Sequence, residues 1–544
     1  MEEFTVRYYD LCLCLFLGLL FYAVLRAIFG SGTKQRRLRL PPGPWQLPVI
    51  GSLHHLVRGL PHRTIRDLSL RYGPLMQLRV CERLAIVVSS AEAVGEIYKG
   101  NEALFSERLS SPGIDELSRH GQGIVFAPYG DHWRLLRRIL MTELLSARRV
   151  EAFRRIREEE AARLVWSVQA ASPPSGGGLV NINELLDEFM TDSVVRAIFG
   201  DKLPDRAAFL RTVRQGVQLS SLFDLRDLFP SSRLVRLLSR RGSKAERQRL
   251  EAFRLMDNIL KAHEERRVAR DEDHEQDLVD VLLSMQREGA MRVSLTDGVI
   301  RAVLLDVFGA ALDTTTTLVQ WAMAELMANP RVMLRVQSET RIVLTGQSTI
   351  QDSTLKDMDY LKAVIKETLR LHPPASFFTR VCLQDCKIHG YDVPRGATVL
   401  TNIWAISRDP KYWDEPEMFR PERFEGDIDI NFRGMDFEFT PFGVGRRICP
   451  GIDFAHATIE MALASLLYHF DWDLPKGVEV EKIDMTEELD DNYGGKGGWH
   501  GDPRMQGRCH GSMEEKEEEE MDAPDRYYRP SRPVLLLSPT GITG

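Results

Sequence analysis

The sequence predicts a mainly α-helical protein with a small β region, preceded by an N-terminal transmembrane helix. Three observations predict this class. Residues 11–29 form an almost unbroken apolar run, residues 75–80 and 84–89 alternate apolar and polar side chains, and the patterns from Ala91 onward are mostly helical.

Length and composition set the outer bounds. The chain has 544 residues and a net charge of −7, and length alone would suggest about three or four domains. Much of the negative charge lies in one late acidic run, and the composition gives no sign of a nucleic-acid-binding surface. The seven cysteines are scattered without paired spacings. This favours a reducing compartment over a disulfide framework or a zinc site.

The first segment is predicted to be a membrane anchor, residues 1–30. Its apolar run is long enough to cross a bilayer, and Arg26 lies close enough to the end to snorkel. The chain starts mainly acidic, unlike a cleaved signal peptide, and basic residues follow the run. By the positive-inside rule the body of the protein lies on the cytosolic side. The alternative is a buried core helix.

A basic and proline-rich hinge, residues 31–44, comes next. It ends in Pro41-Pro42-Gly43-Pro44, which cannot be helical and makes a stiff spacer. Residues 106–129 are rich in Gly and Ser and predict a long loop, which in a compact domain is usually functional. Residues 172–178 predict a surface loop, and the charge run at 266–276 predicts a solvated linker.

The longest helical pattern covers residues 294–329. Ser294 and Asp297 predict a capping box at its start, and Pro330 stops it. Another helix is predicted at 355–371, before Pro373-Pro374. Residues 382–402 predict short strands, and residues 452–470 predict an apolar helix.

The stretch before that last helix, residues 442–451, carries the strongest chemical signal. Its three glycines predict a tight turn that lets a flat group approach the backbone. Cys449 stands at the mouth of the helix, where the dipole and free N–H groups would stabilise a thiolate, a soft metal ligand. Taken alone, such a cysteine is more often a small buried hydrophobe. Arg447 could pair with a haem carboxylate if the metal is haem iron.

The complete spacing F-x-x-G-x-R-x-C-x-G resembles the cysteine-ligand signature of the haem-thiolate monooxygenases, the cytochromes P-450. The resemblance covers residues 41–488 and is strongest to plant microsomal members that serve specialised metabolism. It implies a single monooxygenase domain, residues 45–488, instead of several. It also implies heme b (iron-protoporphyrin IX) with Cys449 as the iron ligand. The motif positions that would hold this cofactor are Phe442, Gly445, Arg447 and Gly451.

Three further motifs match the family in order. Trp133 and Arg137 lie four apart on one helix face and would reach haem propionates. A surface cation packed on an aromatic ring is the commoner meaning of that spacing. Arg380 matches another propionate-pairing position. Glu367 and Arg370 lie at i and i+3, where exposed pairs are common and contribute little; the resemblance implies that they are buried and joined by Arg423 to seat the haem.

Asp313 and Thr314 lie in the middle of the longest predicted helix. Four successive threonines are poor helix formers, and one interpretation is a hydroxyl that bonds back to a carbonyl. The resemblance implies instead a local opening beside the iron, where Asp313 and Thr314 deliver protons to bound dioxygen. The family usually has Gly where this chain has Ala311, which questions how readily the helix opens.

The resemblance implies a monooxygenase that inserts one atom of dioxygen into a hydrophobic small molecule. Two electrons would come from NADPH through a flavin-containing membrane partner, NADPH-cytochrome reductase, with NADPH and flavins bound only by that partner. Arg446 and cations near Trp133 are candidates for docking it. The expected location is the endoplasmic reticulum membrane, single-pass, with the catalytic domain cytosolic.

The substrate pocket is expected to be lined by residues 106–125, 205–228, 302–313 and 375–379. Phe223, Phe377 and Phe378 would make it apolar, which suits a terpenoid, fatty or phenolic compound. Aromatic side chains at such positions are also common in cores.

The end of the chain departs from the family pattern. Residues 489–531 are acidic and Gly-rich without an apolar period, which predicts a disordered insertion. Residues 532–544 are similar to a displaced terminal strand. Two other functions stay open: a haem-thiolate lyase or isomerase that acts on a peroxide, and a membrane-anchored haem protein disabled by its altered terminus. The intact Asp313–Thr314 pair argues against the lyase or isomerase.

Overall fold

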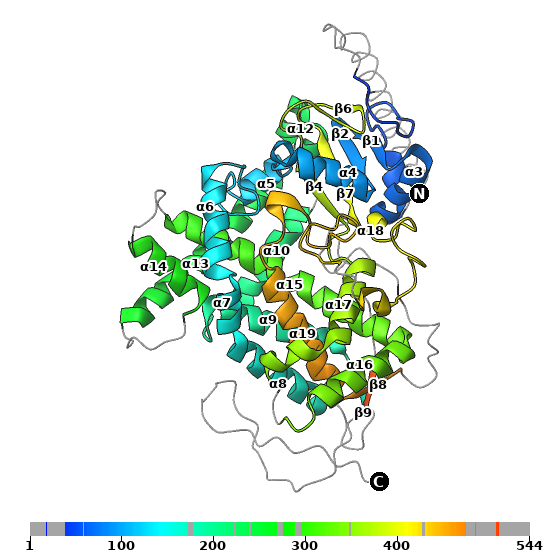
Figure 1. Cartoon of the computed structure of the whole chain (residues 1–544). Helices are drawn as coiled ribbons and strands as arrows, with labels where there is room; N and C mark the ends of the chain where they lie inside the picture. Colours follow the sequence, from blue (N-terminus) through cyan, green and yellow to red (C-terminus); the bar gives the residue numbers. More distant parts are fainter. Residues whose placement is uncertain are drawn as a thin grey trace, which may run out of the picture.

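The computed structural model describes residues 38–474, apart from gaps at 58, 172–177, 222–224, 239–240, 269–275, 289–294, 348–349 and 427–429, and also residues 18, 485 and 507–510. The predicted anchor run at 11–29, apart from residue 18, lies outside the described residues, as do Phe223 and residues 532–544. In Figure 1 a small sheet, coloured blue and yellow, lies toward one end of the molecule, and the longer helices fill the rest.

Helices dominate the described chain, as predicted. Three of them begin with proline at the first position, which suits a residue with no N–H to donate. The helices before residue 240 are α2 (Leu53–Leu56), α3 (Pro61–Tyr72), α4 (Ala91–Gly95), α5 (Pro112–Leu117), α6 (Asp131–Ile139), α7 (Ala147–Ala152), α8 (Arg154–Ala171), α9 (Ile182–Phe199), α10 (Arg206–Ser221), α11 (Leu225–Leu228) and α12 (Arg233–Leu238). Those after it are α13 (Arg241–Val268), α14 (Leu278–Glu288), α15 (Asp297–Ala328), α16 (Pro330–Val343), α17 (Asp359–Leu371), α18 (Ile403–Ile406) and α19 (Ile452–His469).

The main sheet joins the two predicted early strands to two later ones. β1 (Leu75–Val80) and β2 (Arg83–Val88) form a hairpin, and β7 (Thr398–Asn402) runs parallel to β2. β4 (Phe377–Val381) completes the order β1-β2-β7-β4 and runs antiparallel to β7. β5 (Cys386–Ile388) and β6 (Tyr391–Val393) form a separate hairpin. The sheet therefore brings the segment after α17 beside the N-terminal part of the domain.

Helix α15 passes through the core, beside α9 and α19 (Figure 1). Its N-cap is Thr296, whose hydroxyl accepts a hydrogen bond from the Val299 N–H, so the prediction of a cap at Ser294 is wrong. The helix ends before Pro330, as predicted. Among the described residues it alone is long and apolar enough to cross a membrane, but over half of its most apolar window is buried within the protein, as in a core helix.

Two predicted irregular segments contain regular structure. The loop at 106–129 includes the short helix α5, whose N-cap Ser111 accepts a hydrogen bond from Ile114 N–H at 3.2 Å. Within the predicted disordered insertion, β9 (Gly507–His510) pairs with β3 (Gly178–Val180) and β8 (Asp471–Asp473). These four residues form a strand within the predicted insertion, because strand pairing uses backbone groups and needs no apolar period.

Candidate active site

The loop before α19 folds through glycine. Gly443 and Gly445 have φ values of 74° and 69°, a region that side-chain-bearing residues rarely adopt. A Cβ on Gly445 would also lie 3.0 Å from the Glu102 carboxylate. The turn is closed by the Cys449 N–H, which donates to the Phe442 carbonyl at 3.0 Å. These bonds place the Cys449 side chain just before the first turn of α19.

The Cys449 thiol sits in a low-dielectric environment. The Gly451 N–H donates to its sulfur at 3.4 Å, and the charges of Arg137 and Arg108 also favour the thiolate. Burial outweighs these effects, so the pKa of Cys449 is raised above that of an ordinary thiol. The N–H group at the helix mouth thus favours the thiolate, as predicted, but burial has the larger effect on the pKa of the free thiol. A metal bound to the sulfur would stabilise the thiolate despite this burial, because a coordinating thiol is deprotonated.

Four arginines from distant parts of the chain form a cluster at this site: Arg108 and Arg137 act on the thiol, and Arg380 and Arg447 act on Arg108. Burial lowers the pKa of each one, to about 9 for Arg108 and about 10 for Arg447. Mutual repulsion lowers the pKa further at Arg108 and Arg447. Among the described residues, the carboxylates whose charges oppose these arginines are Asp306, facing Arg108, and Glu107, facing Arg447.

This cluster fits a haem. The Arg108 Nε is buried without a hydrogen-bond partner among the described residues. Arg380, 3% exposed, donates to the carbonyl of the neighbouring Thr379. Buried guanidinium groups in excess over carboxylates are unfavourable unless an anion joins them. The two carboxylates of heme b would provide that charge, and a thiol is the matching iron ligand.

Arg447 has a second task that the sequence did not reveal. Its guanidinium donates to the carbonyls of Ser106 at 2.5 Å, Ala127 at 2.6 Å and Val125 at 3.3 Å. It also lies over the Trp133 ring, 4.9 Å from the centroid. Arg447 therefore fastens both ends of the 106–129 segment to the cysteine loop, and its pairing with a haem carboxylate stays a prediction.

In the middle of α15, Ala310 and Thr314 are exposed among buried and half-buried neighbours. The Thr314 hydroxyl donates to the Ala310 carbonyl at 3.0 Å, and α15 stays α-helical throughout this stretch. The structure thus shows the back-bonded hydroxyl and not the local opening. Ala311 fits this result, because alanine favours helix more than the usual glycine. The proton-delivering role of Asp313 and Thr314 stays a prediction.

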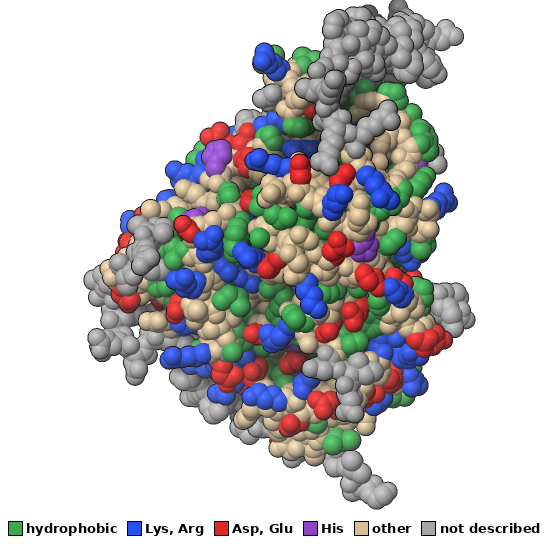
Figure 2. Space-filling model, turned by 45° about the horizontal axis from the view of Figure 1, so that its top comes forward, with side chains coloured by type: hydrophobic (Ala, Val, Ile, Leu, Met, Phe, Trp, Pro, Cys, Tyr) green, Lys and Arg blue, Asp and Glu red, His purple; other side chains and the backbone are tan. Residues whose placement is uncertain are grey.

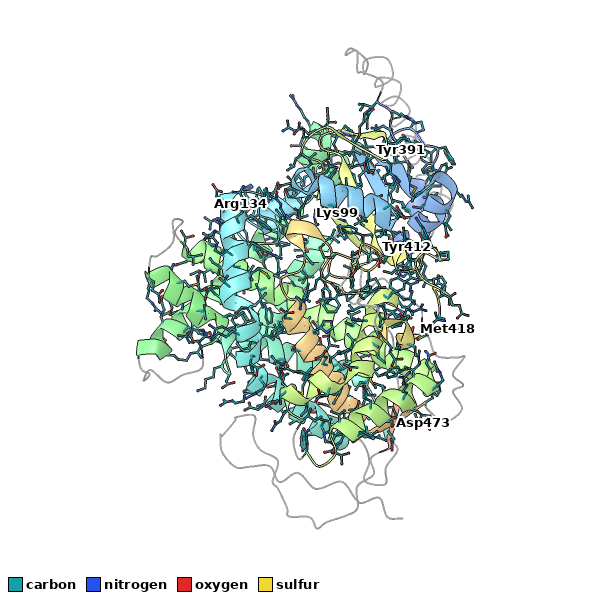
Figure 3. All side chains as sticks on the ribbon, in the orientation of Figure 1. Lys99, Arg134, Tyr391, Tyr412, Met418 and Asp473 are labelled. Atoms are coloured by element: carbon teal, nitrogen blue, oxygen red, sulfur yellow. The ribbon has the colours of Figure 1, made fainter. Side chains whose placement is uncertain are left out.

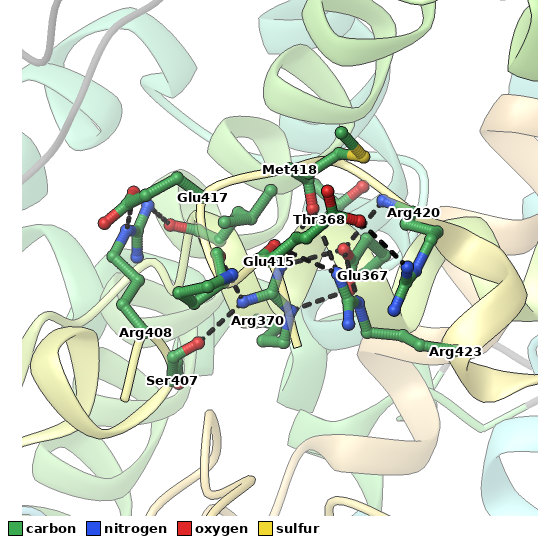
Figure 4. Close-up of polar contacts among 12 residues, drawn as sticks. Glu367, Thr368, Arg370, Ser407, Arg408, Glu415, Glu417, Met418, Arg420 and Arg423 are labelled. Atoms are coloured by element: carbon green, nitrogen blue, oxygen red, sulfur yellow. Dashed lines mark hydrogen bonds and ion pairs between the residues drawn. The ribbon is translucent and has the colours of Figure 1, made fainter. Parts of the chain in front are cut away.

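The structure brings Glu367, Arg370 and Arg423 together (Figure 4). Arg370 makes a two-pronged contact with the Glu367 carboxylate at 2.7 and 2.8 Å, and both side chains are fully buried. Arg423 reaches the same carboxylate at 2.9 Å. The remaining Arg370 N–H groups donate to the carbonyls of Ser407, Pro416 and Met418. The network thus joins α17 to the segment that leads toward the cysteine loop.

The outer face beside the cysteine loop carries cations that are already paired. Arg446 contacts the Glu102 carboxylate at 3.3 Å and the Tyr129 hydroxyl, and Arg134 on α6 pairs with Asp131 at 2.7 Å (Figure 3). Both guanidinium groups lie over the Tyr129 ring. Figure 2 shows Lys and Arg side chains interspersed with Asp and Glu over the visible face.

Two of the three aromatic residues expected to line the substrate pocket, Phe377 and Phe378, pack against apolar clusters. Phe377 packs with a cluster around Met76 under the main sheet, and Phe378 packs with a second cluster and lies edge-on to Tyr98, 5.8 Å between centroids. These contacts favour the interpretation as core residues. Phe223 lies outside the described residues.

Sequence reasoning missed Arg108 and Asp306. Arg108 lies in the segment predicted to be a functional loop, but no motif marked it. Asp306 had a visible signal: it is a lone acid within the apolar run from Ala302 to Phe308. A charge in the buried part of a core helix requires a partner.

Comparison with known proteins decides the family. The cytochrome P450 family model matches residues 41–490. The chain belongs to the cytochrome P450 family. Relatives include desmethyl-deoxy-podophyllotoxin synthase of Sinopodophyllum hexandrum, 42% identical over 88% of this chain and 93% of that protein. Another is 5-epiaristolochene 1,3-dihydroxylase of Nicotiana tabacum, 38% identical over 89% of this chain and 96% of that protein. Ent-cassadiene hydroxylase of Oryza sativa subsp. japonica is 42% identical over 87% and 93%.

A solved zebrafish cytochrome P450 structure with progesterone has the same fold. Its TM-score is 0.69 at 25% identity, and the match covers 84% of this chain and all of that one. This cytochrome P450 is thus a haem-dependent monooxygenase, mainly helical with small sheets, as the motifs predicted.

Proposed function

We propose that this P450 oxygenates an apolar specialised metabolite, with a terpenoid skeleton as the first choice. The support is the naming of relatives: two of the three reported above are named for hydroxylation of a terpene skeleton and the third for synthesis of a podophyllotoxin-type compound. Side chains on the uncovered stretch of α15, such as Ala310 and Ala311, are small and apolar. Such a surface suits a rigid hydrocarbon and offers it few polar contacts.

One observation carries the assignment of the site. The half-buried Cys449 thiol lies near Arg108 and Arg137, and the charges of the arginine cluster exceed the opposing carboxylates of the described residues. Cys449 would bind the haem iron, while Trp133, Arg137, Arg380, Arg447 and also Arg108 would hold the haem carboxylates. When bound, the haem supplies activation of dioxygen. Phe442, Gly445 and Gly451 would shape the turn that presents the sulfur, and Asp313 and Thr314 would hold and pass protons above the haem.

Electrons are proposed to come from NADPH through a membrane-bound flavoprotein reductase. The face that carries Arg134 and Arg446 lies next to the cysteine loop, so it offers a short route to the sulfur. Residues 1–30 would anchor the protein in the endoplasmic reticulum membrane with its catalytic domain in the cytosol. Charge reversal at Arg446 should slow reduction by the reductase and leave reduction by dithionite unchanged; equal rates with the reductase would contradict this docking site.

The test of function uses the full chain reconstituted with reductase in vesicles. A carbon-monoxide difference spectrum of the reduced protein first establishes thiolate-bound haem. Sesquiterpene and diterpene hydrocarbons are then compared with an aryl lignan for NADPH-dependent product that carries one added oxygen. A product formed from a hydroperoxide without NADPH or reductase would favour the lyase or isomerase function. A normal spectrum with no oxygenated terpenoid product would overturn the proposed substrate class.

A further inference from the structure

Asp306 links the core helix to the segment between Ser106 and Tyr129. Its Oδ2 accepts a hydrogen bond from the Val125 N–H at 2.9 Å, and the Ile124 N–H bonds to the same carboxylate. On α15, Asp306 lies about two turns before Thr314. A side chain from the helix thus holds the loop through its backbone. This kind of contact fixes the path of the chain without depending on the loop's own side chains.

Gly123 shows how closely the two segments approach. A Cβ on Gly123 would lie 2.1 Å from Asp306 Oδ2 and 3.1 Å from the Ala302 carbonyl oxygen. The first distance is far inside van der Waals contact, so only glycine fits while the Asp306 carboxylate keeps its position. The backbone of the loop at Gly123 therefore packs directly against α15, with the Asp306 carboxylate between the two segments.

The same short segment is held from the opposite side. The Val125 carbonyl accepts from Arg447 at 3.3 Å, and the Ala127 carbonyl accepts from Arg447 at 2.6 Å. Val125 thus has its N–H on a carboxylate of the core helix and its C=O on a guanidinium of the cysteine loop. The half-buried Asp306 carboxylate and the buried Arg447 guanidinium, which lie on separate elements, thus hold this loop from two sides.

The charge of Asp306 is not explained by ion pairing alone. Arg108 is the charged side chain that acts on it, yet the carboxylate bonds to backbone N–H groups. Burying a carboxylate is costly, and a neutral side chain of similar size would fill the same space. The two N–H bonds are the interactions that the charge strengthens, because hydrogen bonds to an ionised acceptor are about twice as strong as neutral ones.

We propose that Asp306 is a positioning residue for specificity: with Gly123 it clamps the 106–129 loop onto α15, and so sets which carbon of the substrate faces the haem. The residue acts through the loop and does not touch the reacting atoms. The uncovered residues Ala310 and Thr314 lie one and two turns further along the same helix. A shift of the loop would therefore change the space beside this uncovered stretch of α15.

The test uses two probes of the loaded protein, imidazole and 4-phenylimidazole. Both bind haem iron through nitrogen, but only the second carries a ring long enough to reach the loop. We expect Asp306→Asn to weaken 4-phenylimidazole by about tenfold, the value of one charge-assisted hydrogen bond, and imidazole by less than about twofold. Asp297→Asn is the matched control, because Asp297 lies on the same helix at its exposed end. With a terpenoid substrate, product regiochemistry should change in Asp306→Asn and not in Asp297→Asn.

A pair of variants tests the geometry itself. Gly123→Ala should lose 4-phenylimidazole binding and thermal stability, because its Cβ meets the carboxylate. Gly123→Ala combined with Asp306→Ala should recover part of both, because the obstructing oxygen is gone; this rescue is measurable by thermal unfolding even if haem content falls. Equal binding ratios and products in Asp306→Asn and wild type, or strictly additive effects in the double variant, would overturn the proposal.

Discussion

Burial, a backbone hydrogen bond and nearby arginine charges together set the pKa of the Cys449 thiol. Burial raises the thiol pKa, whereas the Gly451 N–H and two arginines lower it, and burial dominates. The residue is therefore set up as a ligand that is completed by its metal, and not as a free reactive thiolate.

Replacing Cys449 by Ser should remove the soft ligand while keeping nearly the same size. We expect the reduced protein to lose the carbon-monoxide spectrum typical of thiolate-bound haem, and oxygenation to fall to background. Cys386→Ser, at a half-buried cysteine near the β5–β6 hairpin, is the control and should keep both. A variant at 449 with an unchanged spectrum would disprove the ligand assignment.

The pKa of the Asp306 carboxyl, about 6, lies within a pH range that experiments can cover. Burial raises the pKa of this carboxyl from 3.8 to about 6, despite the opposing effects of Val125, Arg108 and Ile124. The folded protein thus keeps a proton between about pH 4 and 6 that the unfolded chain releases, so this group favours folding at the acidic end and loses that contribution as pH rises toward 6.

The clamp has the opposite dependence, because it is strongest when the carboxylate is ionised. The ratio of 4-phenylimidazole affinities of wild type and Asp306→Asn should fall as pH drops through about 6. The comparison at each pH cancels protonation of the imidazole nitrogen. A pH profile shared by both proteins would remove Asp306 as its cause.

At the scale of elements, α15 combines a rigid core helix with an uncovered patch. The helix runs without a break through Ala311, and the Thr314 hydroxyl stays bonded to its own helix. Opening the helix must therefore compete with an alanine that favours the closed form.

Ala311→Gly should lower the free energy of unfolding by about 0.5–1 kcal/mol, because glycine costs that much in a helix interior. It should also raise the share of NADPH consumption that yields oxygenated product, because the hydroxyl becomes easier to release. Ala324→Gly, at a buried position near the end of α15, supplies the control: it should lose stability with no change in this coupling. Equal coupling in wild type and Ala311→Gly would mean that the continuous helix does not limit proton delivery.

Unlike the uncovered patch of α15, the Glu367–Arg370–Arg423 network is paired throughout, and Glu367 and Arg370 are fully buried. Glu367→Gln would leave Arg370 and Arg423 without their shared counter-charge, so we expect a loss of about 3–5 kcal/mol in unfolding free energy and poor haem retention. Denaturant unfolding measures the first and the absorbance ratio of haem to protein the second. Glu417→Gln removes an exposed carboxylate that pairs with Arg66 and Arg408 and should change stability by less than about 0.5 kcal/mol.

For the whole molecule, the site is an assembly of distant segments around an excess of buried positive charge. Arg108, Arg137, Arg380 and Arg447 come from a loop, a helix, a strand and the cysteine turn. We therefore expect folding and haem binding to be coupled, because the arginines repel one another until an anion joins them.

Arg108→Leu should change the stability of the haem-loaded and the haem-free protein in opposite directions. In the haem-loaded form it removes an ionic partner and should destabilise by about 1–3 kcal/mol; in the haem-free form it removes a buried cation and should stabilise. Thermal unfolding of both forms measures this. Arg134→Leu, at an exposed arginine, should change neither form appreciably. Destabilisation of both forms to the same extent would mean that Arg108 is not a haem partner.

Local patterns were enough to predict much of the fold. Alternation located β1 and most of β2, and Pro330 marked the end of α15, because each signal depends only on neighbours along the chain. The start of α15 was missed by two residues, since Ser294 and Thr296 are both chemically able to cap. Strand β9 could not have been predicted from local patterns, because both of its pairing partners, β3 and β8, lie outside its sequence neighbourhood.

The sequence by itself determined the candidate residues: the spacing around Cys449 marks the predicted ligand loop, and Glu367, Arg370 and Arg423 are recognisable as motifs. Only the tertiary structure decided the electrostatics and the loop geometry. The raised pKa of Cys449, the surplus of buried guanidinium charge and the Asp306–Gly123 contact depend on which residues folding brings within a few ångströms. Burial and distance set these energies, and neither is a property of local sequence.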